Sequence, residues 1–214
     1  MKKNLDFISR TKDILIVFFQ KCTIISPLII CILLCSITAK AKKETLTANY
    51  VRQQKSNWCW AASAENSVRY ERKTKRTQKD AVKKIKGFFL NPYPNMQGYP
   101  IDIKNAAEYI SFGTENYSCV KHQENFNFLK RQVHIKNVSI VTYGIYKGKE
   151  KIGGHAVAVI GYNDNMEEIQ IYDPSSSGGG KKWFPYNAFQ KGTLKLPSSQ
   201  FKIKYQETIF NLDR

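Results

Sequence analysis

Residues 53–63 of the 214-residue chain read Gln-Gln-Lys-Ser-Asn-Trp-Cys-Trp-Ala-Ala-Ser. Apolar side chains recur at roughly helical spacing from Trp60 to Val68, which predicts a helix over residues 58–70 with Cys59 near its start. Backbone N–H groups converge at a helix N-terminus and its dipole favours an anion, so the thiolate form of a cysteine is stabilised there. The stretch therefore predicts a reactive Cys59, with Trp58 and Trp60 as walls of a substrate-binding site.

Helix signals continue to about residue 135. Thr77 and Asp80 have the spacing of a capping box ahead of a second apolar pattern. Asp102 is the expected N-cap of a third helix that ends at Ile110, with Gly113 just beyond it. Residues 124–135 are a weaker helix candidate.

The second half of the chain changes to strand patterns. Residues 138–146 and 154–162 are rich in β-branched, aromatic and small apolar residues, and a turn of Asn-Asp-Asn then leads to a third strand over residues 168–173. A Ser/Gly loop follows, and residues 201–210 form the last predicted strand. Helices followed by antiparallel strands predict an α+β fold with two packed layers.

A thiol nucleophile needs a base, and His155 is the candidate. It follows Gly153 and Gly154 at the start of a strand of small and apolar residues, which predicts a buried and rigid setting. Gly154 allows another backbone to approach closely, so we expect it to contact substrate. Asp173 ends the next strand of the hairpin, where its carboxylate can accept a hydrogen bond from the His155 Nδ1–H and fix the tautomer. A bare turn at Asp173-Pro174 is the alternative.

Acyl transfer creates an oxyanion that needs donors. Gln53 lies six residues before Cys59 and can offer its side-chain amide, and the Cys59 backbone N–H can supply a second donor. Losing one such donor typically costs about 2.7–4 kcal/mol of transition-state stabilisation. Gln54 is an alternative donor that the pattern leaves open.

The order Gln53, Cys59, His155, Asp173 resembles the papain-like cysteine peptidases. The Trp-Cys-Trp-Ala-Ala string and the spacing from Gly-Gly-His to Tyr-Asp-Pro look most like the small bacterial branches, namely bacteriocin-leader-processing-like peptidases and secreted effector proteases of plant pathogens. The resemblance covers roughly residues 50–190. It implies a papain-like fold, with a helical lobe packed on a sheet lobe, and matches the four residues to the oxyanion donor, nucleophile, base and third triad position. The surroundings of Cys59 differ from the plant-papain signature, so papain's substrate preferences are not expected to carry over.

Residues 1–41 have a different character from the rest. Lysines and an arginine precede Cys22–Ala39, which are eighteen residues without a charge, and Ala39-Lys40-Ala41 has the form of a signal-peptidase site. We expect a signal peptide, with an uncleaved membrane anchor as the alternative, since eighteen residues is at the short limit for a span. Either would export residues 42–214, the predicted peptidase domain, to the periplasm or the medium.

The composition fits a basic globular protein. The chain has 34 Lys and Arg against 17 Asp and Glu, a net charge of +17, and 42% apolar residues, which is too apolar for a disordered protein. Without residues 1–41 the net charge is still +13, with lysine-rich clusters such as residues 69–76. Such a face could meet an anionic surface or an acidic substrate. No helix-turn-helix signature or aromatic interleaving predicts specific nucleic-acid binding.

Two cysteine alternatives accompany the nucleophile. Cys119-x-x-His122 has metal-ligand spacing, and Cys59 with His155 could complete a zinc site, although no second motif supports it. A Cys59–Cys119 disulfide would silence the enzyme in an oxidising compartment. We expect neither metal nor cofactor.

The sequence thus predicts an exported, monomeric cysteine peptidase that hydrolyses peptide bonds of a polypeptide. One alternative is a non-enzymatic basic binding module on a peptidase-like fold. Another is a papain-fold amidase or transglutaminase, which would use the same residues on a different bond or acceptor.

Overall fold

The computed structural model describes residues 42–71, 73–87, 93–196 and 200–213. The predicted leader, residues 1–41, lies outside them. Among the described residues no helix is both long and apolar enough to cross a membrane.

Three helices form the first layer, α2 (Cys59–Glu71), α3 (Gln78–Lys86) and α4 (Pro100–Ile110). They bury a common apolar core that includes Trp58, Val68, Val82, Ile103 and Ile110. The predicted start of the first helix at Cys59 and the capping box of the second are confirmed, since the Thr77 backbone N–H donates to Asp80 Oδ2 at 2.9 Å.

The start of α4 differs from the prediction. Pro100, not a residue after Asp102, is the first helical residue, because proline already has the backbone angle of a first helical turn. Asp102 is the third helical residue and accepts a hydrogen bond from the Tyr99 backbone N–H at 2.7 Å. The carboxylate therefore caps the helix from inside its first turn.

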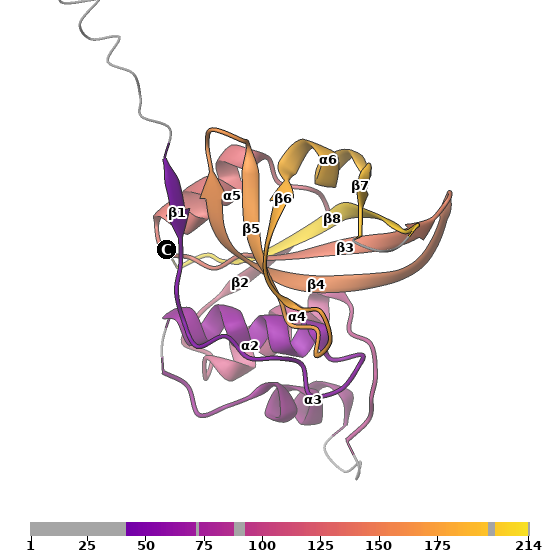
Figure 1. The fold of residues 1–214 in the computed structure, drawn as a ribbon. Coiled ribbons are helices and arrows are strands. Elements are labelled where there is room, and N and C mark those ends of the chain that lie inside the picture. Colours follow the sequence, from indigo (N-terminus) through magenta and orange to yellow (C-terminus); the bar gives the residue numbers. More distant parts are fainter. Residues whose placement is uncertain (1–41, 72, 88–92, 197–199, 214) are drawn as a thin grey trace, which may run out of the picture. The chain divides into compact units, whose positions relative to one another are not determined.

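A single antiparallel sheet forms the second layer (Figure 1), and its described strands are β1 (Lys43–Thr45), β2 (Tyr117–Val120), β3 (Ile140–Lys147), β4 (Glu150–Asn163), β5 (Glu168–Asp173), β6 (Gly180–Pro185), β7 (Leu194–Lys195) and β8 (Lys202–Asn211). Their order is β2-β8-β3-β4-β5-β6, with β1 paired to the end of β4 and β7 paired to β8. The strand β4 lies at the centre and contributes His155.

Alternation along β4 assigns the two faces of the sheet. Ala156 packs into the core with α2 and α4, whereas its neighbour Val157 packs into a second core on the other face. Two helices, α5 (Phe126–His134) and α6 (Tyr186–Lys191), cover this second core. Figure 1 shows both helices on the side of the sheet away from α2 and α3. The architecture is the predicted α+β arrangement, with an additional helical cover on the far face.

Two buried serines attach α2 to β4 and to the segment that leads into β3. Ser63 Oγ donates to the Ala156 carbonyl at 2.9 Å, and Ser67 Oγ donates to the Val138 carbonyl at 2.7 Å. Both hydroxyls lie on one face of the helix, one turn apart. Because Ala156 follows His155 directly, the bond from Ser63 fixes the position of the start of α2 relative to His155.

Candidate active site

Cys59 occupies the first position of α2 and lines a cleft between the helices and the sheet. The helix begins there because the Trp58 carbonyl accepts the first helical hydrogen bond, from the Ala62 N–H at 2.9 Å. The residue is partly exposed, and its thiol is close enough to the imidazole of His155 for the two groups to shift each other's pKa. The predicted pairing of these two residues is present in the structure.

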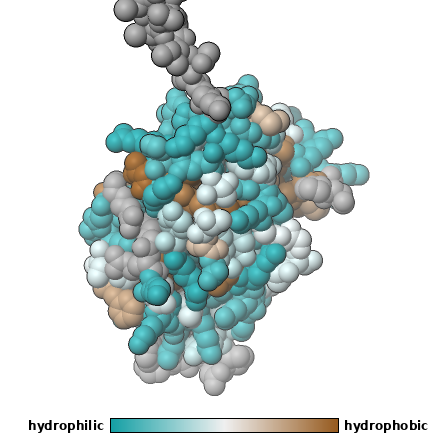
Figure 2. Space-filling model, turned by 60° about the vertical axis from the view of Figure 1, so that its left-hand side comes forward, coloured by the Kyte–Doolittle hydropathy of each residue, from teal (hydrophilic) through white to brown (hydrophobic). Residues whose placement is uncertain are grey.

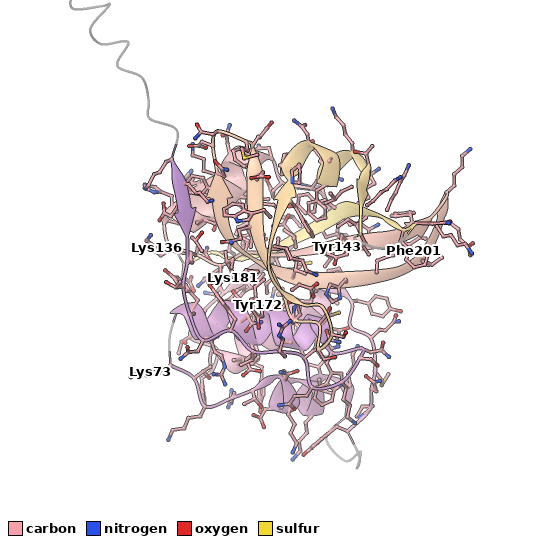
Figure 3. The ribbon with its side chains drawn as sticks, in the orientation of Figure 1. Lys73, Lys136, Tyr143, Tyr172, Lys181 and Phe201 are labelled. Carbon is pink, nitrogen blue, oxygen red and sulfur yellow. The ribbon has the colours of Figure 1, made fainter. Side chains whose placement is uncertain are left out.

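His155 reaches the cleft from β4. It lies opposite Tyr143 of β3 in the strand register, and the two rings are 5.4 Å apart (Tyr143 is labelled in Figure 3). The Tyr143 side chain is buried beneath the imidazole. A packed ring and a central strand therefore restrict the rotation of the histidine.

Asp173 ends β5 and reaches the far edge of the same imidazole. Its Oδ1 lies 2.8 Å from His155 Nε2, so the hairpin of β4 and β5 brings the two residues together as expected. The expected nitrogen was wrong, since Nε2 and not Nδ1 faces the carboxylate. The reason is geometric, because Cys59 approaches one edge of the ring from α2 and leaves the opposite nitrogen to Asp173.

Two further side chains hold Asp173, and the sequence did not single out either. Ser175 donates to Asp173 Oδ1 from its backbone N–H at 2.9 Å, and its Oγ lies 2.6 Å from the same oxygen. Lys182 on β6 donates to Asp173 Oδ2 at 2.7 Å. The only sequence signal was an Asp-Pro-Ser turn, in which Asp side chains commonly accept from the backbone N–H two residues on.

The electrostatics of the three groups favour a charged pair. Burial raises the pKa of the Cys59 thiol, but the hydrogen bond and charge of His155 and the backbone N–H groups of Ala156 and Trp60 outweigh it, so the pKa falls. Burial lowers the pKa of His155, and the hydrogen bonds to Asp173 and Cys59 more than reverse this and raise it to about 9. For Asp173, burial is likewise outweighed by His155, Lys182 and Ser175, which hold the pKa of the carboxyl well below its usual range.

Gln53 lies beside Asp173 in the structure, but it is not one of the described residues that line the cleft. Its backbone N–H donates to the Pro174 carbonyl at 2.7 Å, and its side-chain Nε2 donates to the Ser56 carbonyl at 2.8 Å. The amide nitrogen has a second hydrogen that this bond does not use. Gln54, the alternative donor, is exposed, and its backbone N–H donates to Gln78 Oε1.

The cleft has a volume of about 420 Å³ and has a helical and a sheet wall. The helical wall includes Trp60 and the segment around Gly98 and Tyr99, and the sheet wall includes Gly154 and His155. Both Trp60 and Gly154 thus lie where the sequence placed them. Trp58 does not line the described cleft, because its ring is buried in the core and its Nε1 donates to the Pro94 carbonyl at 2.9 Å.

Neither cysteine alternative finds support in the geometry. Cys59 and Cys119 are both free thiols, and Cys119 lies on β2 opposite Ile209. Within the described residues, no group of three or more His, Cys, Asp or Glu side chains gathers as metal ligands would. His122 is exposed beside Glu124.

The profile of the Peptidase_C39 like family matches residues 45–205, well over half of the chain. The chain belongs to this family. It is therefore a cysteine-type peptidase. No curated protein matches the sequence of this Peptidase_C39 like chain at a significant level.

Solved structures similar to this Peptidase_C39 like chain include two proteases. A double glycine motif protease from an AMS/PCAT transporter, solved in complex with the leader peptide, is 14% identical, with a TM-score of 0.47 over 76% of this chain and 94% of that one. Xylellain, a cysteine protease from Xylella fastidiosa, is 13% identical, with a TM-score of 0.46 over 78% of this chain and 85% of that one.

Proposed function

We propose that Cys59, His155 and Asp173 are the catalytic triad of this cysteine peptidase and that it hydrolyses peptide bonds in polypeptides. The observation that carries the proposal is the placement of Cys59 and His155 on facing walls of one open cleft, with the imidazole held by the Asp173 carboxylate at 2.8 Å. The opposite pKa shifts of Cys59 and His155 support a thiolate–imidazolium pair as the resting state.

In the first half of the reaction, the Cys59 thiolate attacks the peptide carbonyl carbon and a C–S bond forms. The carbonyl oxygen becomes an oxyanion. The tetrahedral intermediate then collapses, His155 donates its proton to the leaving amine nitrogen, and the C–N bond breaks. The product is an acyl-enzyme with a neutral imidazole.

In the second half, His155 takes a proton from water as the oxygen attacks the thioester carbon. The C–S bond breaks, the carboxylic acid product leaves, and the thiolate–imidazolium pair returns. An amine in place of water would give transglutaminase chemistry, and water acting on an acyl-enzyme from another amide would give amidase chemistry, so both use the same residues. Asp173 keeps the imidazole oriented through both halves.

We propose that two groups donate hydrogen bonds to the oxyanion, the Gln53 Nε2 through its unused hydrogen and the Cys59 backbone N–H. The bond of Gln53 to Ser56 orients the amide, and its backbone bond to Pro174 ties it to the residue after Asp173. The N-terminus of α2 adds the favourable end of the helix dipole.

We further propose that residues 1–41 export residues 42–214. The support is the charge-free run Cys22–Ala39 and the Ala39-Lys40-Ala41 site in the sequence. Expression in a bacterial host followed by N-terminal sequencing of the extracytoplasmic protein tests this. A chain that starts at Lys42 supports cleavage, a full-length membrane-bound chain indicates an anchor, and retention in the cytoplasm refutes export.

The catalytic proposal is tested with an unfolded protein such as casein as substrate. Wild-type chain and the Cys119→Ala control should release peptides at similar rates, whereas Cys59→Ala should lose hydrolysis. Because general acid–base catalysis alone contributes about 10²- to 10⁴-fold, His155→Ala should also lose most of the rate. Unchanged hydrolysis by Cys59→Ala would refute the assignment.

A further inference from the structure

Lys182 is the one lysine of the described residues that pairs with the carboxylate of Asp173. It lies on the edge strand β6, opposite Ile171 of β5, and its Nζ reaches Asp173 Oδ2 at 2.7 Å. The Asp173 side chain is 7% exposed and that of Lys182 is 31% exposed. The ion pair is thus covered on the carboxylate side and reaches solvent on the ammonium side.

The two oxygens of Asp173 have different partners. Oδ1 serves His155 Nε2 and both hydrogen-bonding groups of Ser175, whereas Oδ2 accepts from Lys182. Donors on opposite oxygens fix the rotation of the carboxylate. Without Lys182, a buried carboxylate oxygen would lose its charged donor, which is costly in a protein interior.

Several charged or titratable groups face this centre from different elements. Cys59 approaches from α2, Tyr143 lies beneath the imidazole on β3, and Lys182 comes from β6. From the segment before α2, the Arg52 guanidinium donates to the Ser175 carbonyl at 2.7 Å. Of the two cations, Lys182 is the one bonded to the carboxylate itself.

We propose that Lys182 is a positioning residue of the active site, which holds the Asp173 carboxylate for His155 and sets, through its charge, the pH range in which Cys59 is a thiolate. The proposal rests on the triad proposed above. A cation beside the Asp173–His155 pair opposes protonation of the imidazole and favours the thiolate. Removing this charge should therefore shift two steps to higher pH. The first is the deprotonation of Cys59, which forms the thiolate–imidazolium pair, and the second is the deprotonation of the His155 imidazolium, which ends it.

The test measures the rate of iodoacetamide alkylation of Cys59 against pH in the full chain, by mass spectrometry of the Cys59 peptide. Lys182→Met removes charge and donor, and Lys182→Arg keeps both. Lys181→Met removes the neighbouring exposed lysine, which is labelled in Figure 3 and pairs in register with Tyr172. Thermal unfolding checks each variant, and Lys182→Gln replaces Lys182→Met if that variant does not fold.

We expect the alkylation profile of Lys182→Met to shift to higher pH, with a rate about twofold to fivefold below wild type on the acidic side, as for a partly exposed ion pair. Lys182→Arg and Lys181→Met should follow the wild-type profile. Coincident profiles for wild type and Lys182→Met, or an equal shift in Lys181→Met, would overturn the assignment.

The same data separate this inference from the triad on which it rests. A wild-type Cys59 that reacts with the pH profile of an ordinary thiol would refute the triad, and the role of Lys182 with it. A wild-type profile typical of a thiolate that Lys182→Met leaves unmoved would refute the role of Lys182 alone.

Discussion

The thiol of Cys59 and the imidazole of His155 change each other's protonation in opposite directions. Their hydrogen bond lowers the pKa of the thiol and contributes to raising that of the imidazole to about 9. Between these two pKa values the thiol is a thiolate and the imidazole is an imidazolium. The thiolate is therefore already present when the substrate binds. Activity should accordingly fall on the alkaline side as the pH rises through about 9.

Asp173→Asn tests how the carboxylate affects the protonation of the Cys59–His155 pair. The amide keeps one acceptor oxygen for His155 but removes the negative charge, so the pKa of His155 should fall. We expect the alkaline limit of activity to move to lower pH, with kcat lower by at least about tenfold. The pH dependence of casein hydrolysis measures it, and an unchanged range would contradict the proposed role of Asp173.

The three residues proposed as the triad could be singled out because each one carries a local signal. Cys59 begins a helix, and Asp173 ends the second strand of a hairpin. His155 follows two glycines, but it lies within β4 and not at its start, because the strand begins at Glu150 and not at the predicted Gly154. Lys182 could not be predicted, since it is one of two adjacent lysines that precede two aromatic residues in a short strand, with no mark of its own. Its role depends on the pairing of β5 with β6, which is a tertiary property.

At the level of elements, α2 and β4 form the frame of the site. The Ser63 bond to the Ala156 carbonyl ties the start of the helix to the strand, next to His155. Trp60 donates from Nε1 to the Met96 carbonyl at 3.1 Å, which holds the segment before α4 against the cleft. The cleft wall thus depends on contacts of residues far from Cys59 in sequence.

Two glycines of the cleft walls are expected to respond differently to a methyl group. A Cβ at Gly98 would fall on the Trp60 ring, so Gly98→Ala should lower the free energy of unfolding by about 1–3 kcal/mol. A Cβ at Gly153 would meet Ile145 only at 3.9 Å, so Gly153→Ala should change stability by less than about 0.5 kcal/mol. Urea unfolding measures both, and equal losses in the two variants would contradict the description of these walls.

Elements with a clear local period could be predicted, and elements that depend on tertiary contacts could not. The helix at Cys59 and the strand over residues 168–173 agree closely with the structure. The strands β1 and β7 have three and two residues and exist only through pairing with β4 and β8. The helix α6, of six residues, is held by the burial of Tyr186 and Phe189 against the sheet, which no local pattern indicates.

At the scale of the whole molecule, the surface is strongly basic. Residues 42–214 have a net charge of +13, and Figure 2 shows a face on which hydrophilic residues predominate. The basic side chain of Lys151 is exposed and lines the cleft, where its Nζ donates to Gln206 Oε1 at 2.9 Å. The acidic side chain of Glu207 lines the same cleft. We therefore propose that the basic surface attracts acidic substrates, because the electric field of a large net positive charge acts over a long range.

Two peptides with the same cleaved sequence and either Asp or Lys flanks test this attraction. Salt screens exposed charges, so kcat/KM for the acidic peptide should fall severalfold from low to high salt concentration, whereas that for the basic peptide should not fall. Parallel salt dependence for the two peptides would show that the surface charge has no part in substrate choice.

The most direct test of a thiolate activated by His155 is the ratio of alkylation rates of Cys59 and Cys119 in the wild-type chain near pH 6. The pKa of Cys119 is raised by burial and by the nearby Glu207, so it should stay a thiol. We expect iodoacetamide to label Cys59 at least about tenfold faster, and the difference to vanish in denaturant. Equal or slower labelling of Cys59 in the folded chain would contradict the account.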